Sequence, residues 1–242
     1  MSNIYNSVVN NHLDFYNSII TGKNKNIKEL LDKNGISILK GFFENIDIVL
    51  NFYEIAYSKP NKKRIVLCGF NPGRFGAGKT GVPFFDYLSL SQILPYVKNN
   101  DSERSAKFIW SIISKIGQNK FFENVYLTNI SWFGFTVKEK NKNGNIYTKN
   151  INYFKLEEEI KGEIFNEFLK EMDIINPSVI FPLGDEVSND INILNNKHKK
   201  NWKINNSLKH PNYCSFPKNI EEWQKKYIEE INIEINKSKT SA

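Results

Sequence analysis

Cysteine is scarce in this chain of 242 residues, and Cys68 and Cys214 are the only two. A site built from four cysteine ligands, as in many structural zinc centres and iron–sulfur clusters, is therefore excluded. Two cysteines so far apart also give no disulfide framework, which is typical of a protein that works in a reducing compartment. We therefore expect a cytoplasmic protein.

Long apolar runs are missing as well. No stretch approaches the roughly 18 apolar residues that a membrane-spanning helix requires. The first residues, MSNIYNSVVNNHLDFYNS, contain no basic start followed by an apolar run, so they do not predict a signal peptide. No internal repeat is found either. The sequence thus predicts neither export nor insertion into a membrane.

Basic residues exceed acidic ones, with 33 Lys and Arg against 26 Asp and Glu and a formal net charge of +7. Such an excess is typical of proteins that bind nucleic acids. A general abundance of lysine in the chain would produce the same excess without any partner. Charge alone therefore leaves a nucleic-acid partner and a merely solvated surface as alternatives.

Segments with the apolar pattern of strands alternate along the chain with segments that have the apolar spacing of helices. Three short apolar runs, with a weaker fourth, predict strands at residues 64–69 (RIVLCG), 124–128 (NVYLT), 178–181 (SVIF) and 206–210 (NSLKH). Apolar residues spaced three or four apart predict helices over residues 46–57, 153–175 and 223–235. This alternation predicts an α/β fold whose central, mostly parallel, four-stranded sheet is flanked by helices. Binding sites in such folds lie beyond the carboxyl ends of the strands.

No stretch of the sequence is typical of a linker between domains. We therefore expect one domain over residues 1–242, in which residues 1–60 form an N-terminal helical extension. The polar segment KEKNKNGNIYT, residues 138–148, predicts an exposed loop or a hairpin.

The segment GFNPGRFGAGKTGVPF, residues 69–84, contains two motifs. From Gly73, GRFGAGKT fits the phosphate-binding P-loop pattern G-x-x-x-x-G-K-[ST]. A P-loop must run directly into a helix whose N-terminus faces the phosphates. Here Gly81 and Pro83 follow Lys79 and Thr80, and a proline inside a helix costs about 3 kcal/mol or more. A P-loop nucleotide hydrolase therefore remains an alternative that the sequence disfavours.

The second motif begins at the end of the predicted strand, where Asn71 precedes Pro72. A residue before proline favours extended geometry, which would hold the Asn71 amide at the edge of the sheet. The glycines of this loop permit close approach of other groups. Phe84 ends the loop with an aromatic face on which a planar ring can stack. These features predict a pocket for a nucleobase.

The same segment closely resembles the first motif of the single-strand-selective monofunctional uracil-DNA glycosylases, a branch of the uracil-DNA glycosylase superfamily. NVYLTNISWF places Asn129 where this branch has the asparagine that reads the uracil edge, and LKHP places His210 where it has its catalytic histidine. The resemblance covers residues 64–227 and implies the three-layer α/β fold of these enzymes. Two departures, Arg74 in place of a usual proline and the ending HPNYCSFPK, indicate a divergent bacterial branch.

The resemblance implies a monofunctional DNA glycosylase that hydrolyses the N-glycosidic bond of uracil, leaves an abasic site and uses no metal or organic cofactor. It implies that Asn71 holds the attacking water and that His210 stabilises the departing base, so these two are the expected catalytic residues. The expected substrate-binding residues are Gly69, Phe70, Gly73, Phe84 and Asn129. The expected DNA-binding residues are Arg74, Lys79, Pro211, Asn212 and Tyr213.

Uracil-containing DNA, single- or double-stranded, is the implied partner, and the nucleotide must leave the base stack to be cleaved. We expect a monomer that works on the nucleoid of a bacterium.

On the residues alone, a lone histidine is often structural and asparagines often form turns. A catalytically silent DNA-binding relative is therefore an alternative. The mismatch-specific branch is another, although it typically has Asn-Pro-Ser where this chain has His210-Pro211. Xanthine, hypoxanthine and modified uracils stay open as substrates.

Overall fold

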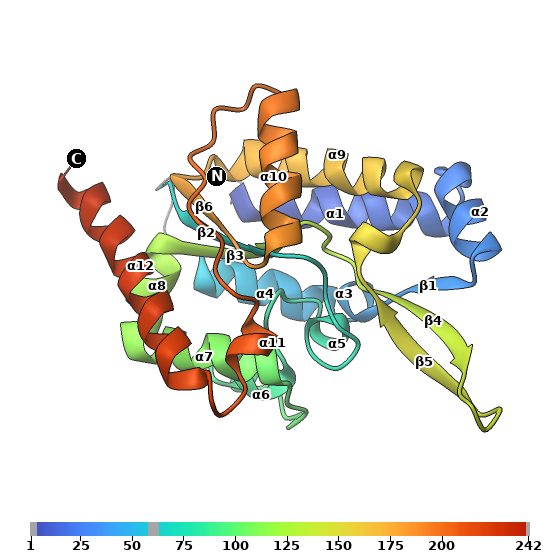
Figure 1. Ribbon diagram of the computed structural model, residues 1–242, viewed down its shortest axis with the longest axis horizontal. Coiled ribbons are helices and arrows are strands. Elements are labelled where there is room, and N and C mark those ends of the chain that lie inside the picture. Colours follow the sequence, from blue (N-terminus) through green and yellow to red (C-terminus); the bar gives the residue numbers. More distant parts are fainter. Residues whose placement is uncertain (1–3, 58–62, 241–242) are drawn as a thin grey trace.

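A parallel sheet lies at the centre of the computed structural model, which describes residues 4–57 and 63–240. Its middle strand, β2 (Ile65–Gly69), pairs in parallel with β3 (Val125–Asn129) and with β6 (Val179–Pro182) (Figure 1). Every residue of the three strands is buried, because helices cover both faces of a parallel sheet. This explains why the strands are mostly apolar, and these three predicted strands are confirmed to within one residue.

The predicted fourth strand, residues 206–210, is not formed, so the parallel sheet of the described residues has three strands instead of four. Ile180 of β6 donates its N–H to Lys203 O and accepts from Asn205 N. Two residues further on, Pro182 accepts from Leu208 N but has no N–H to donate. The ladder stops there, and only isolated parallel bridges, at Ile204 and Leu208, join this segment to the sheet.

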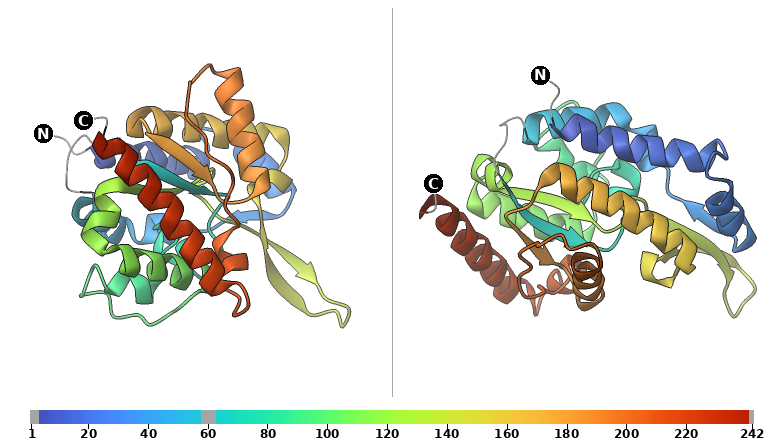
Figure 2. Two further views of the ribbon diagram at one scale, coloured as in Figure 1. Left: turned by 60° about the vertical axis from the view of Figure 1, so that its left-hand side comes forward. Right: turned by 90° about the horizontal axis from the view of Figure 1, so that it is seen from above.

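Helices lie on both sides of the parallel sheet and give the predicted three layers, with α1 and α12 on opposite sides in the right-hand view of Figure 2. The predicted helices are confirmed as α4 (Ile46–Ala56), α9 (Glu158–Ile175), which follows a 3-10 turn at Tyr153–Lys155, and α12 (Ile220–Thr240). The remaining helices of this part of the chain are α5 (Ala77–Thr80), α6 (Tyr87–Ser91), α7 (Arg104–Ile116), α8 (Gln118–Asn124), α10 (Asp185–Lys197) and α11 (Pro211–Cys214).

The N-terminal residues form α1 (Ile4–Ile20), α2 (Lys25–Lys33) and α3 (Gly41–Glu44). They are mostly helical apart from the short strand β1 (Ile36–Ile38), and the extension over residues 1–60 stays a prediction, with residues 1–3 and 58–60 outside the described residues. α1 packs against α4 and α9, and Tyr5 of α1 stacks on Tyr57 with ring centroids 4.7 Å apart. None of the helices in the described ranges is long and apolar enough to span a membrane.

A second, antiparallel sheet has the order β1-β4-β5, where β4 is Phe135–Lys140 and β5 is Ile146–Ile151. β1 pairs only with the first three residues of β4. The outer parts of β4 and β5 therefore pair only with each other, and they form a two-stranded arm that projects from the body (Figure 1). The prediction of a hairpin within residues 138–148 is confirmed.

A buried polar network lies behind β3, the strand that ends at Asn129. The Glu171 carboxylate of α9 accepts a hydrogen bond of 2.7 Å from the Thr128 hydroxyl, which in turn accepts one of 3.1 Å from Trp132 Nε1. His12 of α1 places Nε2 3.3 Å from the same carboxylate. Since buried polar groups of this kind are stable only when paired, the network fixes the end of β3 against α1 and α9.

Candidate active site

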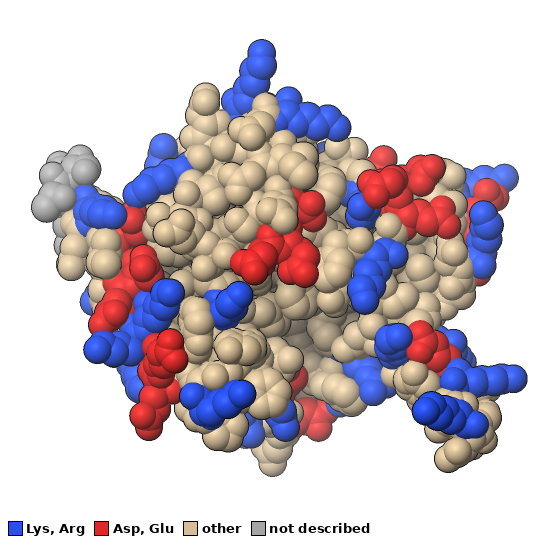
Figure 3. Space-filling model, viewed as in Figure 1, with Lys and Arg blue, Asp and Glu red and all other residues tan. Residues whose placement is uncertain are grey.

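A cavity of about 370 Å³ opens beyond the carboxyl ends of β2 and β3, within the range of volumes found for small-molecule sites. The surface is hollowed between α11 and the loop that contains α5 (Figure 3). The cavity is lined by residues 70–77, Phe84, Glu103, Ser105, Asn129, Asn150, Asn152, His210 and Asn212. The structure therefore brings eight of the twelve predicted site residues to one wall: Phe70, Asn71, Gly73, Arg74, Phe84, Asn129, His210 and Asn212.

Gly69 lies beneath the cavity, where Phe84 and Asn129 meet over its Cα atom. A Cβ atom added to Gly69 would lie 2.5 Å from Asn129 Oδ1 and 2.6 Å from Phe84 Cζ, closer than such atoms can approach. Phe84 itself has a left-handed backbone with a φ of 64°, which is uncommon for a bulky residue and is held only by surrounding structure. The Thr80 hydroxyl provides part of this support by donating to Phe85 O over 2.8 Å.

Asn129 is buried, with 3% of its surface exposed, and its side chain lines the cavity. Among the described residues, no donor or acceptor pairs with its side-chain amide. Its amide atoms reach the cavity, because they are not among the fully buried side-chain atoms that lack a hydrogen-bond partner in the described residues. The amide is therefore available to pair with a ligand that presents one acceptor and one donor.

Asn71 has the opposite environment, because both ends of its amide are engaged by the backbone. Its Oδ1 accepts from Tyr153 N over 2.9 Å, and its Nδ2 donates to Ile151 O over 3.3 Å and to Pro72 O over 3.2 Å. One partner is an N–H and the others are carbonyls, so the amide has a single favourable orientation. Oδ1 keeps a second lone pair, which can hold a water molecule at the cavity wall.

His210 precedes α11 and lines the cavity beside the end of β2, where Phe70 follows that strand. Its ring stacks on Phe70, with centroids 4.1 Å apart and an interplanar angle of 18°, and lies 6.4 Å from the Phe84 ring. Nδ1 accepts from Asn212 N over 3.2 Å, so the neutral ring carries its proton on Nε2. Burial lowers the pKa of His210 to about 4. The ring is therefore a neutral hydrogen-bond donor near pH 7.

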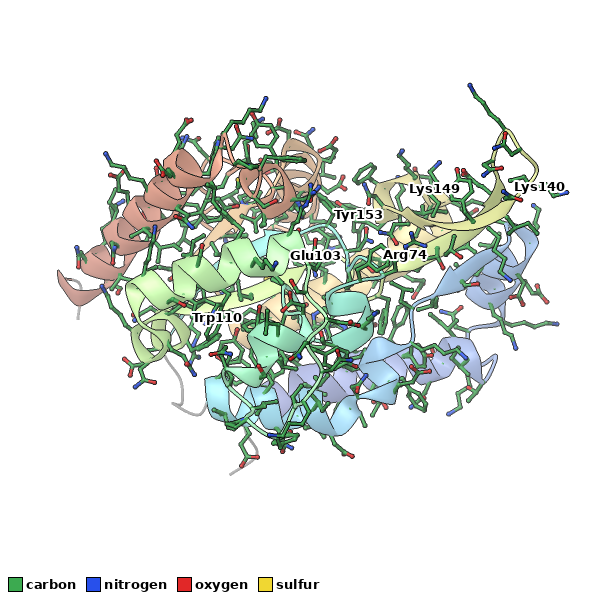
Figure 4. All side chains as sticks on the ribbon, turned by 90° about the horizontal axis from the view of Figure 1, so that it is seen from below. Arg74, Glu103, Trp110, Lys140, Lys149 and Tyr153 are labelled. Carbon is green, nitrogen blue, oxygen red and sulfur yellow. The ribbon has the colours of Figure 1, made fainter. Side chains whose placement is uncertain are left out.

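Charged groups lie at the rim. The Arg74 guanidinium lies 4.4 Å from the centre of the Phe75 ring, and Figure 4 shows Arg74 and Glu103 on neighbouring loops. The Glu103 carboxylate caps α7 by accepting from Ala106 N and Ser105 Oγ, each over 3.1 Å. In the described ranges, no three His, Cys, Asp or Glu side chains gather where they could hold a metal ion.

Eight lining residues were not predicted as site residues. Four of them lie within the motif segment (Pro72, Phe75, Gly76 and Ala77), and four lie outside it (Glu103, Ser105, Asn150 and Asn152). Glu103 caps α7 in the structure, but glutamate is not among the residues that signal a helix start in a sequence. Asn150 and Asn152 reach the cavity because β5 returns to the body of the molecule. No local pattern in the sequence reveals this return.

The P-loop pattern does not form a phosphate site. α5 has four residues and stops before Gly81, whose φ is 78°, so the pattern does not run into a long helix. Lys79 forms an ion pair with Asp101, and the Thr80 hydroxyl is buried against the backbone. Lys79, Pro211 and Tyr213 do not line the cavity, and their expected contacts with DNA stay predictions.

Comparisons with known proteins identify the family of this chain. A model of the uracil DNA glycosylase superfamily matches residues 55–232. The crystal structure of wild-type SMUG2 from Pedobacter heparinus is 27% identical and matches with a TM-score of 0.71, over 84% of this chain and 89% of that chain. A search of curated proteins found no match. The resemblance drawn from the motifs is thereby confirmed, and the chain belongs to the uracil DNA glycosylase superfamily.

Proposed function

We propose that the protein is a monofunctional DNA glycosylase that hydrolyses the N-glycosidic bond of uracil in DNA and leaves an abasic site. Membership of the superfamily and the similarity to SMUG2 support glycosylase activity on DNA. The choice of uracil depends on one observation above all. The buried Asn129 amide has no partner among the described residues and lies next to the Phe84 ring, on the wall that it shares with His210.

Asn129 can distinguish uracil from cytosine by hydrogen bonding. Its carbonyl accepts from N3–H of uracil and its NH₂ donates to O4. Cytosine presents an unprotonated N3 and an amino group at these positions, so both contacts would be mismatched. Each buried polar group left unpaired costs about 1–3 kcal/mol. The Phe84 ring, fixed over Gly69, provides the face on which the base stacks.

His210 stabilises the base as it departs. Cleavage of the glycosidic bond places negative charge on the base, including O2, and positive charge on the sugar. The Nε2–H of the neutral imidazole donates to O2 as this charge develops. A preorganised donor of this kind contributes about 2.7–4 kcal/mol to transition-state stabilisation. The stacking of His210 on Phe70 holds the ring in place for this role.

Asn71 positions the attacking water. An amide is too weak a base to deprotonate water, but a cationic sugar needs little activation of its nucleophile. Positioning is therefore the main requirement, and it can supply several kcal/mol of the barrier reduction. The bonds from Tyr153 N and to Ile151 O hold the amide in the orientation that positioning requires.

The target nucleotide enters the cavity either from a single strand or after flipping out of a duplex. Of the residues expected to contact DNA, Tyr213 is 48% exposed on α11, and Phe216 beside it is 40% exposed. Exposed aromatic rings can stack on neighbouring bases. No lysine lines the cavity within the described part of the chain, which supports a monofunctional reaction without a Schiff base. We propose that the protein acts as a monomer on cytoplasmic DNA.

An end-labelled oligonucleotide with one uracil tests the proposal, both single-stranded and paired. The wild type should leave the strand intact until alkali treatment cleaves it at the uracil position. Asn71→Ala and His210→Ala should each slow this reaction. A strand that survives wild-type enzyme and alkali would contradict the proposal, and a break without alkali would contradict the monofunctional step. Oligonucleotides with xanthine, hypoxanthine or modified uracils extend the test to other bases.

A further inference from the structure

The β4–β5 hairpin presents one face that carries no acidic residue. Directly paired residues share a face of an antiparallel ribbon, and faces alternate along each strand. The register pairs Lys138 with Thr148 and Lys140 with Ile146. The face that we call the lysine face therefore carries Thr136, Lys138, Lys140, Ile146, Thr148 and Asn150. Glu139, the only acid between residues 135 and 151, lies on the opposite face.

The two lysines of this face keep their charge uncompensated. Lys138 and Lys140 are exposed, and neither has an ion-pair partner among the described residues. On the opposite face, Glu139 accepts from Lys149 Nζ over 3.0 Å and from Tyr147 Oη over 2.7 Å, so that face is locally neutral. Figure 3 shows Lys and Arg side chains gathered over the arm.

The lysine face begins at the cavity wall. Asn150 lines the cavity and accepts from Arg74 N over 3.3 Å, and the adjacent Ile151 O accepts from the Asn71 amide. At about 3.4 Å per residue, the distance from Asn150 to Ile146 is about 14 Å. That length corresponds to about four stacked nucleotides of one strand. Figure 4 shows the arm, with Lys140 and Lys149 labelled, extending away from Arg74 and Tyr153.

We propose that the lysine face binds the DNA strand that flanks the nucleotide in the cavity. Lys138 and Lys140 neutralise phosphates, and Ile146, which is 66% exposed, packs against a sugar or a base near the tip. The inference depends on the proposed function only in taking DNA as the partner. The ligand class is a single nucleic-acid strand whose backbone runs from the cavity along the arm.

The test measures the affinity of the full-length protein for an unmodified single-stranded oligonucleotide over a series of KCl concentrations. Each phosphate contact contributes about 0.7 to the slope of log K against log [salt] for single strands. The variant Lys138→Gln/Lys140→Gln should therefore reduce the slope by about 1.4. Two controls should keep the wild-type slope: Lys149→Gln on the opposite face, and Lys225→Gln/Lys226→Gln on α12, which removes the same charge far from the arm.

The outcomes separate this inference from the proposed function, because an oligonucleotide of normal bases requires no base release. Suppose that the wild type binds DNA, that the double variant shows a smaller slope of log K against log [salt], and that neither releases uracil. The inference then stands and the proposed function fails. An unchanged slope in Lys138→Gln/Lys140→Gln would overturn the inference. The lysines would then only protect exposed strand edges from pairing with other chains. Failure of the wild type to bind the oligonucleotide would overturn it as well.

Discussion

The cavity and the β4–β5 arm are adjacent regions built on different principles. In the cavity, side chains are buried and fixed: the Asn71 amide is bound at both ends, and Phe84 is held in an unusual backbone conformation. On the arm, Lys138 and Lys140 are exposed and unpaired within the described structure. Chemistry at one bond requires fixed geometry, whereas attraction to a phosphate backbone requires only charge at a suitable spacing.

Two asparagines show the same contrast within the cavity. Asn71 is held at both ends of its amide by backbone partners while Oδ1 keeps one lone pair, which suits a residue that must hold one water in one place. Asn129 is buried without a partner among the described residues, which suits a residue whose partner arrives with the substrate. Substitutions in the fixed region should therefore reduce turnover, while substitutions on the arm should change the salt dependence of binding.

The largest effect is expected for His210→Ala. Removal of one preorganised donor to a developing anion typically lowers the rate 10²- to 10³-fold, and we expect a loss in this range for uracil release. Single-turnover assays with excess enzyme would measure it. Wild-type rates in the folded variant would mean that His210 does not stabilise the departing base.

The next largest effect is expected for Gly69→Ala, which should lower the rate of uracil release roughly 100-fold. The new Cβ atom would displace both Asn129 and Phe84, and misplacement of reacting groups by about 1 Å can cost this much. Gly162→Ala is the matched control, because a Cβ atom there meets nothing within 4 Å. Equal uracil-release rates in the two variants would contradict the proposed packing at the base of the cavity.

Asn129→Ala should reduce kcat/KM for uracil about tenfold. The loss corresponds to about 1.4 kcal/mol, within the range for a missing partner of a buried polar group. DNA affinity measured on an oligonucleotide of normal bases should stay the same, since the proposed role of Asn129 is to contact only the extruded base. A variant that keeps full kcat/KM for uracil would exclude base recognition by this side chain.

The smallest effect is expected in the pH dependence of the free energy of unfolding. The pKa of His210 is about 4 in the folded protein and about 6.5 in an unfolded chain. Between these values the unfolded state binds more protons, so the free energy of unfolding falls as the pH decreases from 6.5 to 4. Thermal unfolding at pH 7 and pH 4.5 should show a smaller loss of stability in His210→Asn than in the wild type. Identical losses, or an imidazole that titrates near pH 6.5 by NMR, would contradict the burial of this ring.

Much of the fold was predictable because its signals are local. Strands buried on both faces have mostly apolar sequences, which is why β2, β3 and β6 were found to within one residue. The fourth strand was predicted wrongly, although the reason that it does not form is also local. Pro182 has no N–H, and the ladder beyond β6 cannot continue past it.

The site was predictable where a motif carried it and unpredictable where the tertiary structure built it. Asn71, Phe84, Asn129 and His210 share one cavity, as the motifs indicated. Asn150 reaches the same cavity only because β5 returns to the body, and Tyr153 N–H orients Asn71 across 82 residues of sequence. Contacts over such separations depend on packing between elements, which no short pattern encodes.

The most direct test of the central claim is a crystal structure of the protein with a single strand that contains a non-hydrolysable deoxyuridine analogue. The uracil ring should lie in the cavity against Phe84, with Asn129 Oδ1 and Nδ2 within hydrogen-bond distance of N3 and O4, and His210 Nε2 within the same distance of O2. A uracil ring bound outside this cavity, or inside it without a contact to Asn129, would contradict the account.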